Sequence, residues 1–231
     1  MPVETRFETE IKEAKLRILE MAGLVEQSLE HASRALSERD SGLLEVVDRL
    51  ENKVNQAHKD IDNTCLGVLA RLAPVAVDLR MVLAIVKINT DLERMGDQAV
   101  NVSKNIRHYL SQEPLSEVRE FTKMVEMVRS MVRDALDSFV NDDVALARKV
   151  LESDDAVDDF KRRFVNKMKE KMSDDPGAIE AALNLILMAR NFERIADHAT
   201  NIAEEVIFIR TGDDIRHGGG KASGGKRDDA E

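Results

Sequence analysis

The stretch "NFERIADHATNIAEE", residues 191–205, combines an apolar helix face with a row of oxygen-bearing side chains. Its apolar residues recur every three or four positions, which is the period of an amphipathic α-helix. Next to this face, Glu193, Asp197 and Asn201 follow one another at intervals of four residues. Side chains at this interval share one narrow strip of a helix. The strip is either a solvated flank or a place that holds a ligand.

The same order of residue types occurs a second time in the chain. Within "DLERMGDQAVNVSKN", residues 91–105, the string Glu-Arg-x-x-Asp-x-x-x-Asn recurs 100 positions earlier, at Glu93, Asp97 and Asn101. Two further segments match loosely at a displacement of 103 positions: "ENKVNQAHKDI" at 51–61 and "DDAVDDFKRRF" at 154–164. Self-similarity at a fixed displacement predicts an internal repeat.

Prolines and turn residues divide the chain into six expected helices. None of the four prolines interrupts a long periodic segment, as expected because proline is tolerated at a helix start and disfavoured inside. Asp175 before Pro176 predicts a capped helix start, and Asn141 or Asp142 is expected to cap the helix before it. The expected helices cover residues 4–38, 42–71, 74–111, 114–140, 142–172 and 176–210. No segment alternates with a period of two, so no strand is predicted.

Short turns make consecutive helices antiparallel neighbours, so each half of the chain is expected to form a three-helix bundle. The predicted fold is therefore all-α, with one bundle in residues 1–111 and a similar one in residues 112–210. The remaining segment, residues 211–231, holds six of the eleven glycines and is predicted to be disordered. Its "GKASGGK" resembles the core of a phosphate-binding loop. Arg227 stands where that motif needs Ser or Thr, so nucleotide binding is not expected.

The composition narrows the function. A net charge of −10 and an isoelectric point near 5.1 argue against nucleic acid as a partner. A single cysteine, Cys65, excludes an intramolecular disulfide and a cysteine-based zinc cage, and it is expected to be buried. No apolar run reaches the ~20 residues of a membrane span and no basic patch stands out. We therefore expect a soluble cytoplasmic protein that meets a membrane only through protein partners.

The two strips have the chemistry of a metal site. Like charges at an interval of four residues repel each other, so the strips do not stabilise their own helices. Carboxylate and amide oxygens are hard ligands that suit Mg²⁺, Ca²⁺, Mn²⁺ or iron. One strip cannot complete a coordination sphere, and Asp48, Glu51 and Asp60 are possible helpers. The predicted metal ligands are Glu93, Asp97, Asn101, Glu193, Asp197 and Asn201.

Two longer segments carry a resemblance. "PVAVDLRMVLAIVKINTDLERMGDQAVNV" and "LILMARNFERIADHATNIAEEV" resemble the third and sixth helices of the PhoU family of phosphate-uptake regulators. The shared features are Asp78-Leu79-Arg80 after a proline, and "LERMGD" and "FERIAD" followed four residues on by Asn. The resemblance covers both repeats, about residues 7–210.

The resemblance implies a fold, a cofactor and partners. Members of the family fold as two similar three-helix bundles and bind metal ions, or multinuclear iron or zinc clusters, through the E(D)xxxD motif of each repeat. They are negative regulators of the phosphate-starvation response, linking a Pst-type phosphate ABC transporter to a sensor kinase and its response regulator, and they often form homodimers. By position, the implied ligands are Glu93, Asp97, Glu193 and Asp197, with Asn101 and Asn201 as additional candidates.

The repeats also differ, and other functions stay open. The second repeat lacks a counterpart of Asp78-Leu79-Arg80, and it has Asn191 where the first has Asp91, so the two metal sites are expected to differ. His198 corresponds to Gln98, which disfavours a shared ligand role. A carboxylate-bridged metalloenzyme lacks the Glu-x-x-His pairs that such sites use, so no enzyme is expected. A metal-free helical scaffold and an accessory of another phosphate transporter are the remaining alternatives.

Overall fold

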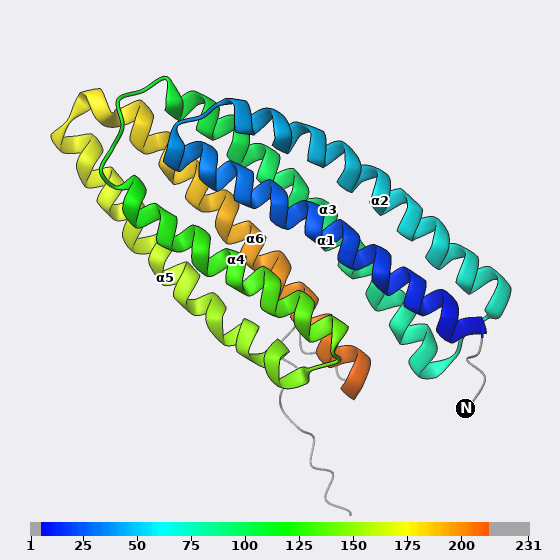
Figure 1. The fold of residues 1–231 in the computed structure, drawn as a ribbon. Coiled ribbons are helices and arrows are strands. Elements are labelled where there is room, and N and C mark those ends of the chain that lie inside the picture. The colour runs from blue at the N-terminus through cyan, green and yellow to red at the C-terminus, as the bar shows by residue number, and fades with distance from the viewer. Residues whose placement is uncertain (1–5, 213–231) are drawn as a thin grey trace, which may run out of the picture.

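The computed structural model describes residues 6–212, and within this range the chain forms long helices and no strand. Figure 1 shows the helices running side by side along one long axis. They are α1 (Arg6–Glu38), α2 (Gly42–Leu72), α3 (Ala76–Leu110), α4 (Val118–Val140), α5 (Val144–Asp174) and α6 (Ile179–Thr211), with a short 3₁₀ turn, η1 (Pro176–Ala178), before α6. The predicted all-α fold with six helices is confirmed.

Each half of the chain forms a three-helix bundle, as the sequence predicted. The first bundle contains α1, α2 and α3, and the second contains α4, α5 and α6. α3 and α6 form the most extensive helix pair in the molecule, and they run antiparallel where the bundles meet (Figure 1). α2 flanks α3, α5 flanks α6, and α1 and α4 cover the central pair from one side. The buried apolar residues of both bundles make one continuous core.

The repeat extends to the burial of individual positions. Residues 91–103 and 191–203 show the same sequence of buried, half-buried and exposed positions over all thirteen residues. Close helix packing contributes to this match. A Cβ atom on Gly96 would lie 3.1 Å from Cγ1 of Val54, so α3 approaches α2 more closely here than a larger side chain would allow. The corresponding residue, Ala196, is small and fully buried.

Local signals explain most helix ends. Asp175 accepts a hydrogen bond from the backbone N–H of Gly177 (3.1 Å), so the expected cap before Pro176 is confirmed. The predicted cap of the preceding helix is wrong by one or two residues. Asp143 accepts from the N–H groups of Ala145 and Leu146, while Asp142 turns the chain with a φ of 53°.

Several helix boundaries differ from the prediction by one to four residues, and two of them show what sets a helix end. α4 begins at Val118 and not at 114, because residues 111–117 form a turn in which the N–H of Leu115 donates to Oη of Tyr109 (2.8 Å). α6 extends to Thr211, and Gly212 ends it with a φ of 78°. The rest of the segment predicted to be disordered, residues 213–231 with its phosphate-loop-like string, lies outside the described residues.

Cys65 lies in the core, as expected, and burial raises the pKa of its thiol to about 11.

None of the helices between residues 6 and 212 combines the length and the apolar content needed to cross a membrane.

Candidate functional site

The strip of the second repeat lies on α6 beside α5, where more carboxylates gather. Nζ of Lys161 on α5 donates to Oε1 of Glu193 at 2.7 Å. Two acids of α5 lie close to Asp197: the charge of Asp158 acts on both Asp154 and Asp197, and the charge of Asp197 acts on Asp154. We call these four carboxylates the second acidic cluster: Asp154, Asp158, Glu193 and Asp197. The cluster holds four acids and a single lysine counter-charge.

The charges of the second acidic cluster repel each other. Burial, followed by the negative charges of Asp197 and Asp158, raises the pKa of Asp154 to about 6. Burial also raises the pKa of Asp197, to which Glu193 and Asp158 add, while His198 and Lys161 act in the opposite direction. Carboxylates that resist ionisation in this way are stabilised by a nearby cation.

The strip of the first repeat has different neighbours. Glu93 is half-buried and Asp97 is exposed on α3, like their counterparts on α6. The α2 positions that match the three polar residues of α5 are Glu51, Asn55 and His58. Nδ2 of Asn55 donates to Oε1 of Glu51 at 3.0 Å. We call Glu51, Glu93 and Asp97, which correspond to three members of the second acidic cluster, the first acidic cluster; an amide and an imidazole stand at the positions of the fourth carboxylate and the lysine.

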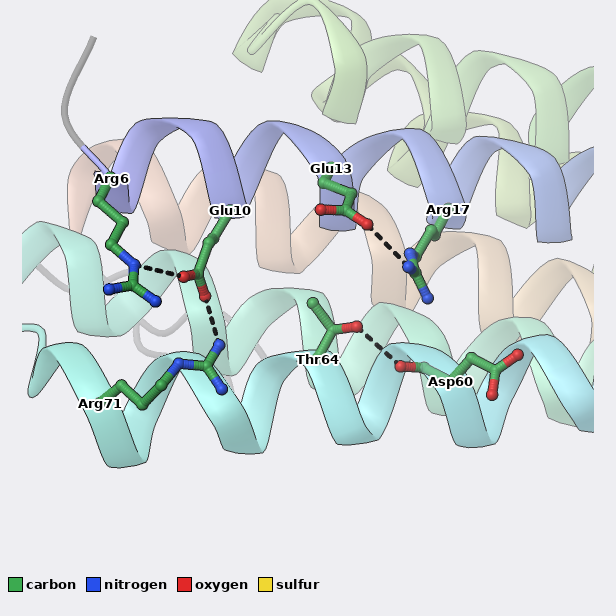
Figure 2. Close-up of polar contacts among 7 residues, drawn as sticks. All are labelled: Arg6, Glu10, Glu13, Arg17, Asp60, Thr64 and Arg71. Carbon is green, nitrogen blue, oxygen red and sulfur yellow. Dashed lines mark hydrogen bonds and ion pairs between the residues drawn. The ribbon is translucent and has the colours of Figure 1, made fainter.

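Of the three possible helper residues, only Glu51 occupies a position equivalent to one in the second acidic cluster. Asp48 forms an ion pair with Arg107 of α3 at 2.6 Å. Asp60 lies on the side of α2 that faces α1, where it lines a groove together with Glu13 and Arg17 (Figure 2). Nine residues separate Glu51 from Asp60 and advance the helix by two and a half turns, so Asp60 lies on the opposite side of α2 from Glu51.

Asn201 contacts the other repeat. Its Nδ2 donates to Oδ1 of Asp91 on α3 at 3.1 Å, and Nδ1 of His198 lies 2.9 Å from the same oxygen. Asp91 is only 7% exposed. One helix turn along, Nζ of Lys87 pairs with Oε1 of Glu205 at 3.0 Å. These contacts form a polar seam between α3 and α6, and Asn201 belongs to this seam.

Asp91 is a functional candidate that the sequence reasoning passed over. Its signal was present, because Asp91 is matched by Asn191 in the other repeat and the two strips were otherwise alike. What the pattern did not reveal is that His198 and Asn201 approach Asp91 from the opposite helix. Contacts between repeats cannot be read from the spacing inside one repeat.

Comparison with known proteins decides the family. The model of the PhoU domain matches residues 18–106 and again residues 121–206, so both halves of the chain are covered. The chain belongs to the PhoU family. The resemblance noted in the sequence is thereby confirmed, and the fold of six helices in two repeats is that of the family.

Curated relatives match almost the whole chain. A PhoU homologue from Pseudomonas putida, a phosphate-specific transport system accessory protein, is 38% identical over 94% of this chain and 85% of the relative. The homologue from Aquifex aeolicus is 36% identical over 90% of this chain and 94% of the relative. All are accessory proteins by name, so the expectation that this PhoU family member is not an enzyme is confirmed.

Solved PhoU structures have the same fold. The crystal structure of PhoU from Pseudomonas aeruginosa is 37% identical and superposes with a TM-score of 0.85, covering 90% of this chain and 100% of that chain. The phosphate transport system regulatory protein PhoU from Streptococcus pneumoniae also gives a TM-score of 0.85, at 27% identity, covering 91% of this chain and 99% of that chain. The arrangement of α1 to α6 is therefore shared with two experimental structures.

The donor chemistry of the acidic clusters fits a hard cation. Within residues 6–212, no three His, Cys, Asp or Glu side chains stand close enough together to hold a metal ion as they are placed. The ligand candidates in this PhoU repeat pair offer carboxylate or amide oxygen, which suits Mg²⁺, Mn²⁺ or iron better than a soft metal. Binding to the second acidic cluster would require Lys161 to leave Glu193, because the ammonium group now takes the position of a cation.

The PhoU repeats carry equivalent grooves with different charges. The groove between α1 and α2, a cavity of about 370 Å³, includes Glu13, Glu20 and Asp60. Its rim holds an ion-pair network in which Glu10 binds Arg6 (3.1 Å) and Arg71 (2.7 Å), as Figure 2 shows. The hydrogen bond from Arg71, opposed by partial burial and assisted by Arg6, lowers the pKa of Glu10.

The corresponding groove between α4 and α5, about 560 Å³, is lined by more basic residues than acidic ones. Its cations are Arg119, Lys123, Arg163 and Lys167. The expectation that no basic patch stands out is therefore wrong at this groove. The patch escaped notice because its residues come from two helices and alternate with acids along each.

Proposed function

We propose that the protein represses phosphate uptake and the phosphate-starvation response as an adaptor. In this proposal it connects a Pst-type phosphate ABC transporter with a sensor kinase and its response regulator. The observation that carries the proposal is the double match to the PhoU domain, over residues 18–106 and 121–206, in a chain whose relatives are phosphate-transport accessory proteins. An accessory of another phosphate transporter is the second candidate, since the names of the relatives do not specify the signalling partner.

The adaptor is proposed to carry metal on its two acidic clusters. Glu93 and Asp97 would hold the ion of the first repeat, and Glu193 and Asp197 that of the second. Burial, together with the negative charges of Asp197 and Asp158, raises the pKa of Asp154, and this supports a cation in the second repeat. A bound cation would supply positive charge that offsets these acids. Elemental analysis would distinguish a single hard cation from a multinuclear iron or zinc cluster.

The side chains of this chain would serve two tasks around such an ion. Carboxylates on α5 and α6 would hold it between two helices of one bundle, which joins those helices. Asn101 and Asn201 are not assigned a ligand role in this proposal, because Asn201 donates to Asp91 across the seam. Asn201 is proposed to keep α3 and α6 in register, so that a change at the second acidic cluster reaches the other repeat.

Contact with partners is proposed to use exposed apolar residues at the starts of α3 and α6. Leu79 and Leu83 on α3 are partly exposed, and so are Ile179 and Leu183 at the equivalent positions of α6. Apolar side chains repeated in both bundles favour protein contacts, including a homodimer. Recruitment to the membrane would then occur through transporter or kinase subunits, on the cytoplasmic side.

The test combines a deletion strain with metal analysis. A strain without the gene is expected to express its phosphate-starvation genes in high phosphate, and the intact gene is expected to restore repression. The Asp97→Ala/Asp197→Ala variant, compared by elemental analysis of untagged protein purified without chelator, is expected to lose its metal. Normal repression in the deletion strain would contradict the regulatory role. Repression by a folded variant that lacks metal would support the metal-free scaffold.

A further inference from the structure

Another cavity, distinct from the two grooves and the two acidic clusters, lies on the seam between α3 and α6. Its volume is about 300 Å³. The lining includes three cations, Lys104 of α3 with Arg190 and Arg194 of α6, and three amide side chains, Asn101, Asn105 and Asn191. No Asp or Glu of the described chain belongs to this lining. In a chain with a net charge of −10, a cavity lined by three cations and no acid is unusual in its charge.

Within residues 6–212, the polar side chains that line the cavity have no hydrogen-bond or ion-pair partner. Across residues 6–212, none of the three cations forms an ion pair, and no side-chain hydrogen bond involves Asn191. Asn191 is only 9% exposed. The side chain of Asn191 lines the cavity, so its amide group is available to a ligand or water there. Ligand-sized space next to unpaired donors is what an anion requires.

The seam has a second half that is related to this cavity by the internal repeat. In that half, charged side chains are paired within the protein. Exchange of α3 and α6 maps Lys104 onto Glu204 and Asn191 onto Asp91. In that half, Asp91 accepts from His198 and Asn201, and Lys87 pairs with Glu205. One half of the seam is thus closed by internal contacts, while the other half keeps its cations available.

We propose that this cavity binds a phosphate group. Two arginines and a lysine can each donate to phosphate oxygens, arginine with a fork geometry that matches two of them at once. The amide nitrogens of Asn101 and Asn191 provide further donors. The same chemistry recognises free inorganic phosphate and the phosphomonoester of a phosphorylated side chain. The inference rests on the cavity alone and does not require metal on the acidic clusters.

The test is calorimetric titration of the full chain, treated with chelator, at constant ionic strength. Inorganic phosphate and O-phosphoserine are titrated separately, with chloride as the blank. The Arg190→Gln/Arg194→Gln variant is expected to bind at least about tenfold more weakly, because it loses two charged donors to the phosphate oxygens. Arg94→Gln, at the counterpart of Arg194 in the closed half of the seam, is the matched control and should bind like the unaltered chain.

The outcomes separate clearly. Tighter binding of inorganic phosphate assigns the cavity to the free ion, and tighter binding of O-phosphoserine assigns it to a phosphorylated group. Both support the proposal if the double variant weakens binding and keeps the circular dichroism spectrum of the unaltered chain. No binding of either compound would overturn it, and so would equal binding by the double variant. Neither result depends on metal content, so the adaptor proposal is judged separately.

Discussion

The two grooves of the molecule occupy equivalent places and carry opposite charge. A displacement of 103 positions maps Glu20 and Asp60 of the α1–α2 groove onto Lys123 and Arg163 of the α4–α5 groove. The backbone plan is therefore shared between the repeats while the surface is not. The two halves of this PhoU family member therefore present surfaces of different charge to their surroundings.

The cores of the two bundles also correspond position by position, with different side chains. Phe121 and Phe192 of the second bundle pack edge to face, with ring centroids 5.6 Å apart. Their counterparts in the first bundle are the aliphatic residues Ile18 and Leu92, which are equally buried. These core positions are thus filled by large apolar side chains in both bundles, by aromatic residues in the second and by aliphatic residues in the first.

Truncation of a core side chain is expected to have the largest effect on stability. Phe192→Ala should lower the free energy of unfolding by about 4 kcal/mol, and Leu92→Ala by about 3 kcal/mol, because both leave cavities in a shared core. Urea denaturation followed by circular dichroism measures the two values. A cost below about 1 kcal/mol for either variant would contradict the tight packing described for that bundle.

The metal affinities of variants of the two acidic clusters are expected to differ. Asp197→Ala is expected to weaken metal binding in the second repeat by about 10–100-fold, on the order found when a group that supports a metal site is removed. Asp97→Ala should affect only the first repeat. Titration of each variant with Mn²⁺ or Fe²⁺, monitored by calorimetry, would show one remaining class of site in each case. Loss of both classes in a single variant would mean that the sites are coupled.

A smaller effect follows from the raised pKa of Asp154. Its folded pKa of about 6 lies above the ordinary value of 3.8, so the folded state prefers the protonated form. Stability from this group is present below pH 3.8 and is lost as the pH rises toward 6. Metal-free Asp154→Asn should therefore be more stable than the unaltered chain above pH 6, by about 1 kcal/mol after allowance for solvent screening. Equal stability at all pH values would contradict the repulsion.

Glu10 of the first repeat gives the smallest effect, with the opposite sign. Its pKa is lowered from 4.5 by the hydrogen bond from Arg71, so its stabilising contribution is present above pH 4.5 and is lost as the pH falls below that value. Arg71→Met should reduce the loss of stability on acidification in this range. Denaturation midpoints measured on both sides of pH 4.5 test this, with Lys167→Met in the other groove as the matched control.

Features that follow from short-range pattern were predictable from the sequence. The apolar period located the six helices, Asp175 with Pro176 marked a helix start, and the doubled Glu-Arg-x-x-Asp string revealed the repeat. The seam and the phosphate-sized cavity could not be predicted, because Lys104 and Arg190 belong to different bundles and meet only after folding. The start of α4 was missed because the contact of Tyr109 with Leu115 holds the intervening turn open.

The antiparallel pairing of α3 with α6 also bears on the origin of the molecule. Asp91 contacts Asn201 at one end of the seam, and Asn101 shares a cavity with Asn191 at the other, so exchange of the two helices maps each pair onto the other. Such mutual correspondence is the property of an isologous contact between identical subunits. A single three-helix ancestor could have paired with its own copy through this helix. Fusion of the two genes would then have freed each copy to acquire charges of its own.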